Sequence, residues 1–266
     1  MKSKISVIIL VLVATFSVQS AMAWGKWGHR ISAYIAEQHL TEKAKTECRR
    51  YLKHTLPYHA SWQDYWRNCK GFGEVCTAHS HYVDHNFNLY GKGGNPDRDP
   101  VTRIDKIMKQ MEKGQYKNMP DSIVAMNIKL LIHMTTDMHC PGHVTYPKDM
   151  KFPTKKIIKI GGKKTARHRF WDAAPMFLHP KWNIERFAKA YDTYSEKEIK
   201  KFCKGNPYKW GQANARKMVE TFDYWEENEE FKKMSKEKRK TIEDMTHKQL
   251  AVGGYRLAYI LNRIFK

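Results

Sequence analysis

Apolar positions recur along most of this chain three to four residues apart, which is the spacing of one helix face. The C-terminal segment shows the pattern most clearly, at Leu250, Leu257, Ile260, Leu261 and Ile264. Capping and helix-breaking residues bound the other segments. The pattern predicts helices over residues 29–40 and 41–52, from 100 to a stop at 114, from 122 to a break at 141, from 195 to 205, and over 212–227 and 241–265.

Residues 155–167 depart from the helical spacing. Lys-Ile-Ile-Lys-Ile precedes Gly161-Gly162, and Lys-Lys-Thr-Ala-Arg follows. A Gly-Gly pair between two short extended runs is typical of a β-hairpin. The chain has no Pro/Ser/Gly-rich linker and no internal repeat, so we expect one domain. The predicted fold class is mainly α, a single-domain helical bundle with a short β-hairpin near 155–167.

The first 23 residues have the composition of a secretory signal peptide. Lys2 and Lys4 precede an apolar run over residues 5–18, and Ala21-Met22-Ala23 is a small-x-small cleavage site. The apolar run is too short for a stable transmembrane span. We therefore expect residues 24–266 to form the mature domain, a monomer that begins at Trp24, is exported to a periplasm or secreted, and does not insert stably into a membrane.

The chain is strongly basic, with a formal net charge of +21. Such a charge favours polyanions, which include nucleic acid, anionic polysaccharide and membrane surfaces, although it also suits a basic protein without a specific partner. The Lys/Arg-rich run over residues 232–240 is expected to be a solvated helix face or loop. Charge alone does not choose between these partners.

Five cysteines in an exported protein permit two disulfides and one remaining thiol. Cys69 and Cys76 are close enough in sequence to close a small loop, and Cys48 with Cys203 is a second candidate pair. We expect Cys140 to be an inert packing residue.

The stretch from Leu131 to His143 carries the first candidate chemistry. His133 and Asp137 are four residues apart within a helical pattern, so their side chains project from one face, one turn apart. Pro141-Gly142 then breaks the helix, which lets His143 approach the same space from another direction. A lone His on an apolar helix face is more often a hydrogen-bonded core residue, so repetition of this spacing decides between the two interpretations.

The spacing does recur, at His168 and Asp172. A free amine at Trp24, with its own carbonyl, can form a chelate that His29 completes. A mixture of His and Asp without paired Cys motifs suits catalytic zinc. Nine candidate ligands are too many for one zinc ion and about right for three: Trp24, His29, Asp64, His81, His133, Asp137, His143, His168 and Asp172.

The order of these motifs along the chain resembles that of the zinc-dependent single-strand-specific nucleases of the mung bean nuclease type. These nucleases share a superfamily with zinc-dependent phospholipase C. The resemblance runs from Trp24 to a closing helix that contains residues 249–262. It implies three ligand sets: Asp64, His81, His133 and Asp137; the Trp24 amine and carbonyl with His29 and a bridging Asp137; and His143, His168 and Asp172.

Two details favour a nuclease over a phospholipase. Only four residues separate Trp24 from His29, and the last ligand is Asp172 where the phospholipases place a Glu. The resemblance implies an endonuclease that hydrolyses single-stranded DNA and RNA to 5′-phosphates, with 3′-nucleotidase activity as an option. Its implied catalytic residues are Arg67, Asp64 and Asp137, of which Arg67 neutralises transition-state charge. Its implied nucleobase contacts are stacking on Tyr82 and a hydrogen bond to Asp84.

The chain departs from the family in three places: Trp-Gln-Asp at 62–64, His-Cys-Pro-Gly-His at 139–143, and Lys-Phe-Pro-Thr-Lys-Lys at 151–156. These departures remove no ligand and bear on substrate preference.

His139 is expected to have a packing or supporting role. Because the hairpin adjoins His168, we expect Lys163 and Lys164 to contact substrate phosphates. The alternatives are a zinc-dependent phospholipase C and, from another class, a non-catalytic secreted protein that binds polyanions or zinc.

Overall fold

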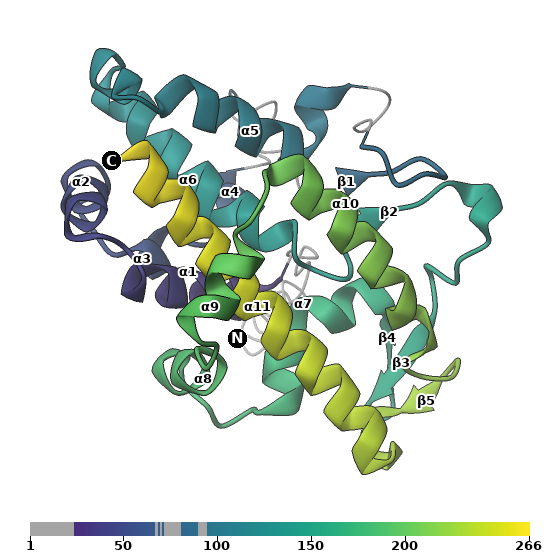
Figure 1. Cartoon of the computed structure of the whole chain (residues 1–266). Helices are drawn as coiled ribbons and strands as arrows, with labels where there is room; N and C mark the ends of the chain where they lie inside the picture. The colour runs from purple at the N-terminus through teal and green to yellow at the C-terminus, as the bar shows by residue number, and fades with distance from the viewer. Residues whose placement is uncertain (1–23, 67–68, 70, 72–80, 90–94) are drawn as a thin grey trace, which may run out of the picture.

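The computed structural model describes residues 24–66, 69, 71, 81–89 and 95–266, and it is mainly helical, as the sequence predicts (Figure 1). The helices are α1 (Lys26–Gln38), α2 (Glu42–Leu52), α3 (Leu56–His59), α4 (Trp62–Trp66), α5 (Pro100–Met111), α6 (Asp121–Asp137), α7 (Arg167–Leu178), α8 (Ile184–Tyr191), α9 (Glu196–Phe202), α10 (Pro207–Met218) and α11 (Lys236–Ile264).

Capping side chains set several of these boundaries. The Asp99 carboxylate accepts hydrogen bonds from the first-turn amides of Val101 and Thr102, and Ser195 with Glu198 forms a reciprocal capping box at the start of α9. Both helix starts are confirmed.

Several other predicted boundaries are wrong, including the start of the helix expected over 241–265, which begins at Lys236. The helix expected over 212–227 begins at Pro207, because Asn206 caps it, and it ends at Met218. The helix expected to reach Pro141 ends at Asp137. The helix expected to stop at Gly114 already ends at Met111, since Lys113 and Gly114 both adopt positive φ angles, of 57° and 78°.

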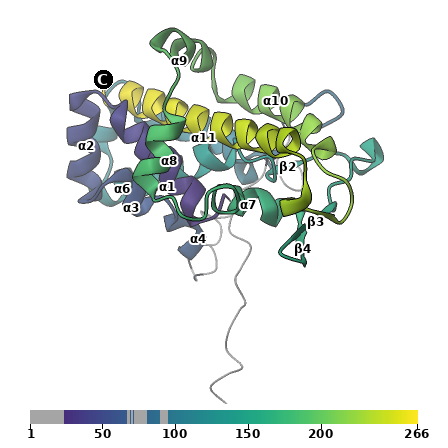
Figure 2. The same cartoon turned by 90° about the horizontal axis from the view of Figure 1, so that it is seen from below.

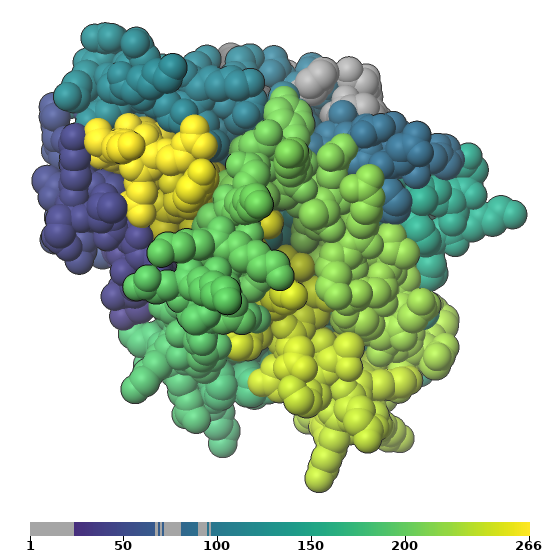
Figure 3. All heavy atoms as spheres, in the orientation of Figure 1, coloured from purple at the N-terminus to yellow at the C-terminus, as the bar shows by residue number. Residues whose placement is uncertain are grey.

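The long helix α11 crosses the molecule diagonally and packs along α1, with further contacts to α6, α7, α8 and α9 (Figure 1). On the face drawn in Figure 3, the green segment that contains α9 crosses over the yellow α11. One apolar cluster lies around α2, α5, α6 and the C-terminal half of α11, and a second lies around α7, α8 and the N-terminal half of α11. Helix α1 contributes to both and therefore lies between them.

Short strands complete the fold. β1 (His81–Tyr82) pairs in parallel with β2 (Val144–Thr145), while β3 (Ile157–Ile160) and β4 (Lys163–Ala166) form an antiparallel hairpin. Gly161 and Gly162 have φ angles of 58° and 79°, which a Gly-Gly turn adopts without steric cost, so the predicted hairpin is confirmed. β5 (Glu229–Glu230) extends this sheet in parallel with β3.

The expected disulfide between Cys48 and Cys203 is wrong. Both are free, buried thiols, and they belong to different apolar clusters. Cys76, the expected partner of Cys69, lies outside the described residues, as do the predicted signal peptide and Arg67. Among the residues that are described, none of the helices combines the length and the hydropathy that crossing a bilayer requires.

Candidate metal centre

The Asp137 carboxylate lies at the middle of the candidate centre, and three imidazole rings surround it. Its Oδ1 is 3.2 Å from His29 Nε2 and 3.7 Å from His143 Nδ1, and its Oδ2 is 3.2 Å from His133 Nε2. The four side chains are at most 1% exposed. The structure thus brings together residues from α1, α6 and the turn that follows α6.

A first group of donors consists of His29, Asp64 and His133, whose ligand atoms all lie within 4.8 Å of one another. The His29 and His133 rings stack with centroids 3.9 Å apart. His133 Nδ1 donates a hydrogen bond to the carbonyl oxygen of Ala60 at 3.0 Å, just before α4. That contact fixes the ring so that Nε2 faces the carboxylates of Asp64 and Asp137, as is usual for a metal-binding His.

A second group forms where α7 meets the turn after α6. His143 Nε2 lies 2.8 Å from His168 Nε2 and 3.7 Å from Asp172 Oδ1, and His168 Nε2 lies 3.6 Å from Asp172 Oδ2. The i, i+4 spacing of His168 and Asp172 is realised on α7. The distances leave these donors facing one another, as the ligands of one cation would.

Cys140 lies at the edge of this second group, with its Sγ 3.8 Å from Asp172 Oδ1. Burial is the largest effect on this thiol and, with the charge of Asp172, raises its pKa well above the ordinary value. Cys140 also belongs to the second group of potential metal donors, so the packing role expected from the sequence stays a prediction.

His81 reaches the centre through strand pairing. Its backbone N–H donates to the carbonyl oxygen of His143 at 3.0 Å, at the point where β1 and β2 pair. The ring is fully buried, and neither ring nitrogen has a hydrogen-bond partner among the described residues. Burial, followed by the nearby charge of His143, lowers its pKa to about 3.

These orphaned nitrogens provide a test of whether the residues fit a metal. Buried polar groups are nearly always hydrogen-bonded, so a buried ring without partners needs an explanation. A neutral imidazole is also the protonation state that binds a metal. Nδ1 of His29 likewise has no partner within the described part of the chain. The donor set of His and Asp therefore fits zinc.

The centre keeps negative charge in spite of its burial. Burial alone would raise the pKa of Asp137, but the charges of His133, His143 and His29 outweigh it and hold that pKa well below the ordinary value. Burial similarly opposes the charged form of His133, yet Asp137 and Asp64 raise its pKa. Asp137 is thus an anion that the surrounding imidazole rings stabilise.

Trp24 lies against the same centre. Its ring is buried, its carbonyl oxygen accepts a hydrogen bond from the His29 amide at 3.3 Å, and its backbone N–H lies beside the Cys140 thiol. Gly25 also approaches Asp172, since a Cβ at this position would lie 3.0 Å from the Asp172 carbonyl oxygen. Trp24 is therefore close to both donor groups, where the sequence expects a chelating amine.

The grouping of donors differs in part from the ligand sets that the resemblance implies. His29 falls with Asp64 and His133, while Cys140 falls with His143 and Asp172. The assignment of each residue to one of three ions stays a prediction. The centre opens to solvent at His168, whose side chain is 44% exposed, against 6% for Asp172.

The structure also describes the residues that were expected to contact the substrate. Lys163 and Lys164 are exposed on β4, directly before α7. The Tyr82 amide donates to Asp99 Oδ2 at 3.2 Å, which ties β1 to the start of α5. The Asp84 carboxylate already accepts hydrogen bonds from the Asn86 and Asn88 amides, so its contact with a base remains a prediction.

Sequence reasoning placed His139 outside the ligand set, and its contacts agree. Its Nδ1 donates to the Thr135 carbonyl oxygen at 2.6 Å, and its Nε2 accepts from Arg256 at 2.7 Å. The close packing of Gly142 against His168, where a Cβ would lie 2.8 Å from the ring, was not predicted. The signal was present in the Pro-Gly pair, which was interpreted only as a helix break.

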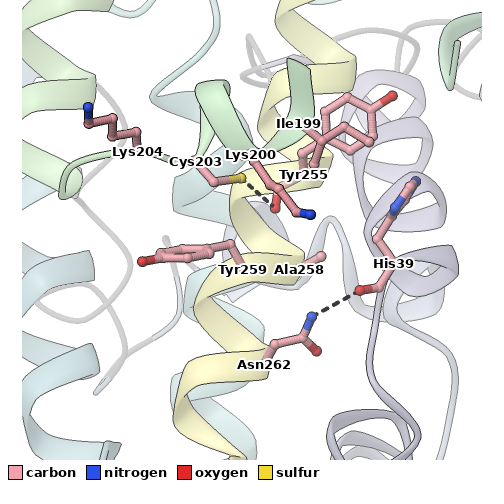
Figure 4. Close-up of a pocket in the computed structure, with 9 residues that line it drawn as sticks. All are labelled: His39, Ile199, Lys200, Cys203, Lys204, Tyr255, Ala258, Tyr259 and Asn262. Carbon is pink, nitrogen blue, oxygen red and sulfur yellow. Dashed lines mark hydrogen bonds between the residues drawn. The ribbon is translucent and has the colours of Figure 1, made fainter. Parts of the chain in front are cut away.

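A separate cavity of about 410 Å³ lies between α1, α9 and α11, and Figure 4 shows its lining. His39, Cys203, Tyr255 and Asn262 contribute to it, and it contains none of the nine candidate ligands. The metal centre is instead a buried cluster with an opening at His168.

Comparison with known proteins identifies the family. The family described as S1/P1 nuclease matches residues 24–266, which is nearly the whole chain and includes every candidate ligand. The comparison with curated proteins gave no match. The chain therefore belongs to the S1/P1 nuclease family, whose members are nucleases that hydrolyse phosphodiester bonds.

Proposed function

We propose that this protein is an exported zinc-dependent endonuclease that cleaves single-stranded DNA and RNA and leaves 5′-phosphates and 3′-hydroxyls. The observation that carries the proposal is the buried Asp137 carboxylate, which lies within 3.7 Å of three imidazole rings. Buried carboxylates and neutral imidazoles converging on one space are the donor set of a catalytic zinc cluster.

Three zinc ions would be held by the nine candidate ligands, with Asp137 shared between two of them. Zinc supplies a Lewis acid for a phosphoryl oxygen and lowers the pKa of a bound water from about 16 to about 7. The Asp137 carboxylate, kept ionised by its three histidines, offsets the positive charge that would otherwise accumulate in the buried site. Release of the Trp24 amine would complete the ligand set.

The chain's own groups account for substrate positioning. His168 marks the opening through which a phosphodiester reaches the centre. Lys163 and Lys164 project from the adjoining hairpin and would hold neighbouring phosphates. Tyr82 would stack on a base, which only an unpaired strand can offer, and this supports a preference for single strands without sequence specificity. Arg67 remains the expected group for transition-state charge.

Asp137→Asn tests the metal mechanism. The substitution removes the shared anionic ligand, so cleavage of single-stranded DNA should fall by more than the roughly 10- to 100-fold typical of residues that only support a ligand. Asp244→Asn is the matched control, because Asp244 is exposed on α11 and pairs only with Lys240 in the described residues. If hydrolysis survives Asp137→Asn, the metal mechanism is wrong.

The substrate class needs a separate comparison. Release of nucleotides from single-stranded and double-stranded DNA and RNA should be measured beside release of phosphocholine from lecithin. The proposal expects single-strand cleavage to dominate. Faster phosphocholine release would make the protein a phospholipase C, and binding of zinc without turnover on any substrate would favour the non-catalytic alternative.

A further inference from the structure

Exposed aromatic side chains gather on the α3–α4 segment, next to the metal ligand Asp64. Tyr58 is 67% exposed, Tyr65 is 62% exposed and Trp66 is 40% exposed. Scattered exposed aromatic residues need no explanation, whereas a cluster of them marks an interaction site. The cluster is adjacent in sequence to Asp64, so an occupant of this surface would lie beside a residue of the metal centre.

The exposed positions lie on two consecutive short helices. Within α4, residues 62, 65 and 66 follow i, i+3 and i+4 spacing, and Tyr58 lies in α3, which only Ala60 and Ser61 separate from α4. Gln63 and Asp64 are buried on the opposite side. The Trp62 and Trp66 rings lie 6.3 Å apart at 34°, so part of this surface is ordered by ring contacts. We call Tyr58, Trp62, Tyr65 and Trp66 the aromatic face.

A cation is fixed beside these rings. Lys129 Nζ of α6 lies 5.2 Å from the centroid of the Trp62 ring. Burial lowers the pKa of Lys129, and no carboxylate among the described residues pairs with it. Stacking rings beside an ammonium group suit a ligand that combines flat apolar surfaces with negative charge.

The aromatic face and the basic hairpin lie on the same side of the molecule. In Figure 2, α4 and the β3–β4 hairpin both project downward, with α7 between them. Asp64 belongs to α4 and His168 to α7, and both are candidate ligands of the metal centre. A strand held by the hairpin at one end can therefore pass the opening and continue toward α4.

We propose that the aromatic face is a second base-stacking subsite, which holds nucleotides of a single strand away from the scissile phosphodiester, with Lys129 contacting a backbone phosphate. This inference rests on the proposed function for the chemistry of the ligand. Aromatic side chains stack on any base, so the subsite adds affinity for longer strands without sequence preference. A short substrate such as a dinucleotide would not extend from the metal centre to this subsite.

The test compares affinities for long and short strands. A cleavage-resistant phosphorothioate oligothymidylate and the matching dinucleotide are bound to the zinc-loaded protein that begins at Trp24, and fluorescence anisotropy gives both dissociation constants. The double substitution Tyr58→Ala/Tyr65→Ala should reduce the ratio of long-strand to dinucleotide affinity by at least about fivefold, the lower limit for loss of one stacked base. Tyr58→Phe/Tyr65→Phe retains the rings and should restore the ratio.

Tyr208→Ala is the matched control, because Tyr208 is an exposed tyrosine of α10, and Figure 2 shows α10 near the top of the view and α4 near the bottom. An unchanged ratio in the alanine variant would overturn the proposal, as would failure of the phenylalanine variant to restore it. Loss of binding to anionic phospholipid vesicles with an unchanged ratio would make the face a membrane-contact surface instead. Because the probe is not cleaved, the ratio can be measured even if the proposed nuclease activity fails.

Discussion

Gly142→Ala should selectively remove one zinc ion from the centre. The added Cβ would lie 2.8 Å from His168 Cδ2 and 3.3 Å from His168 Cα. Carbon atoms in contact are normally about 3.5 to 4.0 Å apart, so the His168 ring would have to move by roughly 0.7 Å or more. Metal–ligand distances tolerate changes of only about 0.2 Å. The methyl group therefore displaces His168 from the position where it faces His143 and Asp172.

The measurement is zinc per chain by atomic emission, together with the rate of single-strand cleavage and far-UV circular dichroism. The variant should keep its fold, bind one zinc fewer than the wild type and cleave about 10- to 100-fold more slowly, as expected when the support of a ligand is lost. Gly162→Ala is the control. It has open space around its Cβ but a φ of +79°, so it should lose about 1 to 2 kcal/mol of stability and no zinc.

A double-mutant comparison tests whether Gly142→Ala lowers zinc content and activity by displacing His168. If Gly142→Ala acts through His168, then adding it to His168→Ala should cause little further loss of zinc or activity. Wild-type zinc content and rate in Gly142→Ala would refute the reasoning, and so would additive losses in the double variant.

Three further predictions concern the surroundings of the centre. Lys163→Ala/Lys164→Ala should flatten the log–log dependence of substrate affinity on salt by about 0.7 for each phosphate that a lysine no longer neutralises, and an unchanged slope would remove the hairpin from the groove. Burial raises the pKa of Asp99 to about 6 despite its helix-capping bonds, so the folded state retains a proton that the unfolded state loses between about pH 4 and 6. Wild-type stability, measured by urea unfolding relative to Asp99→Asn, should therefore fall by up to about 3 kcal/mol as the pH rises through this window, whereas a rise would contradict the burial argument. Cys140→Ala should keep the full zinc content, because the thiol packs against the centre without ligating, and loss of zinc would make it a ligand.

Structural features that depend on a few neighbouring residues were predicted correctly from the sequence. The i, i+4 pairs His133/Asp137 and His168/Asp172 lie on helices with both members turned to the centre, and the Gly161-Gly162 turn forms the hairpin. Each of these depends on local backbone geometry, which a few neighbouring residues determine.

Features that depend on long-range packing were not predictable. The stacking of His29 on His133 requires α1 to lie against α6, and the contact between Gly142 and His168 requires α7 to return to the turn after α6. The wrong disulfide has the same origin, because cysteine spacing gives no connectivity and each thiol is instead buried in its own apolar cluster. The late start assigned to α10 is a local error, since the Asn206-Pro207 cap was overlooked.

The central claim is a three-zinc centre that hydrolyses single strands. The most direct measurement is zinc content of the protein beginning at Trp24, determined beside cleavage of single- and double-stranded DNA by the same preparation. The account predicts three zinc ions per chain and faster cleavage of the single strand, with both lost on chelation and restored by added zinc. Full cleavage activity in protein stripped of zinc would contradict it.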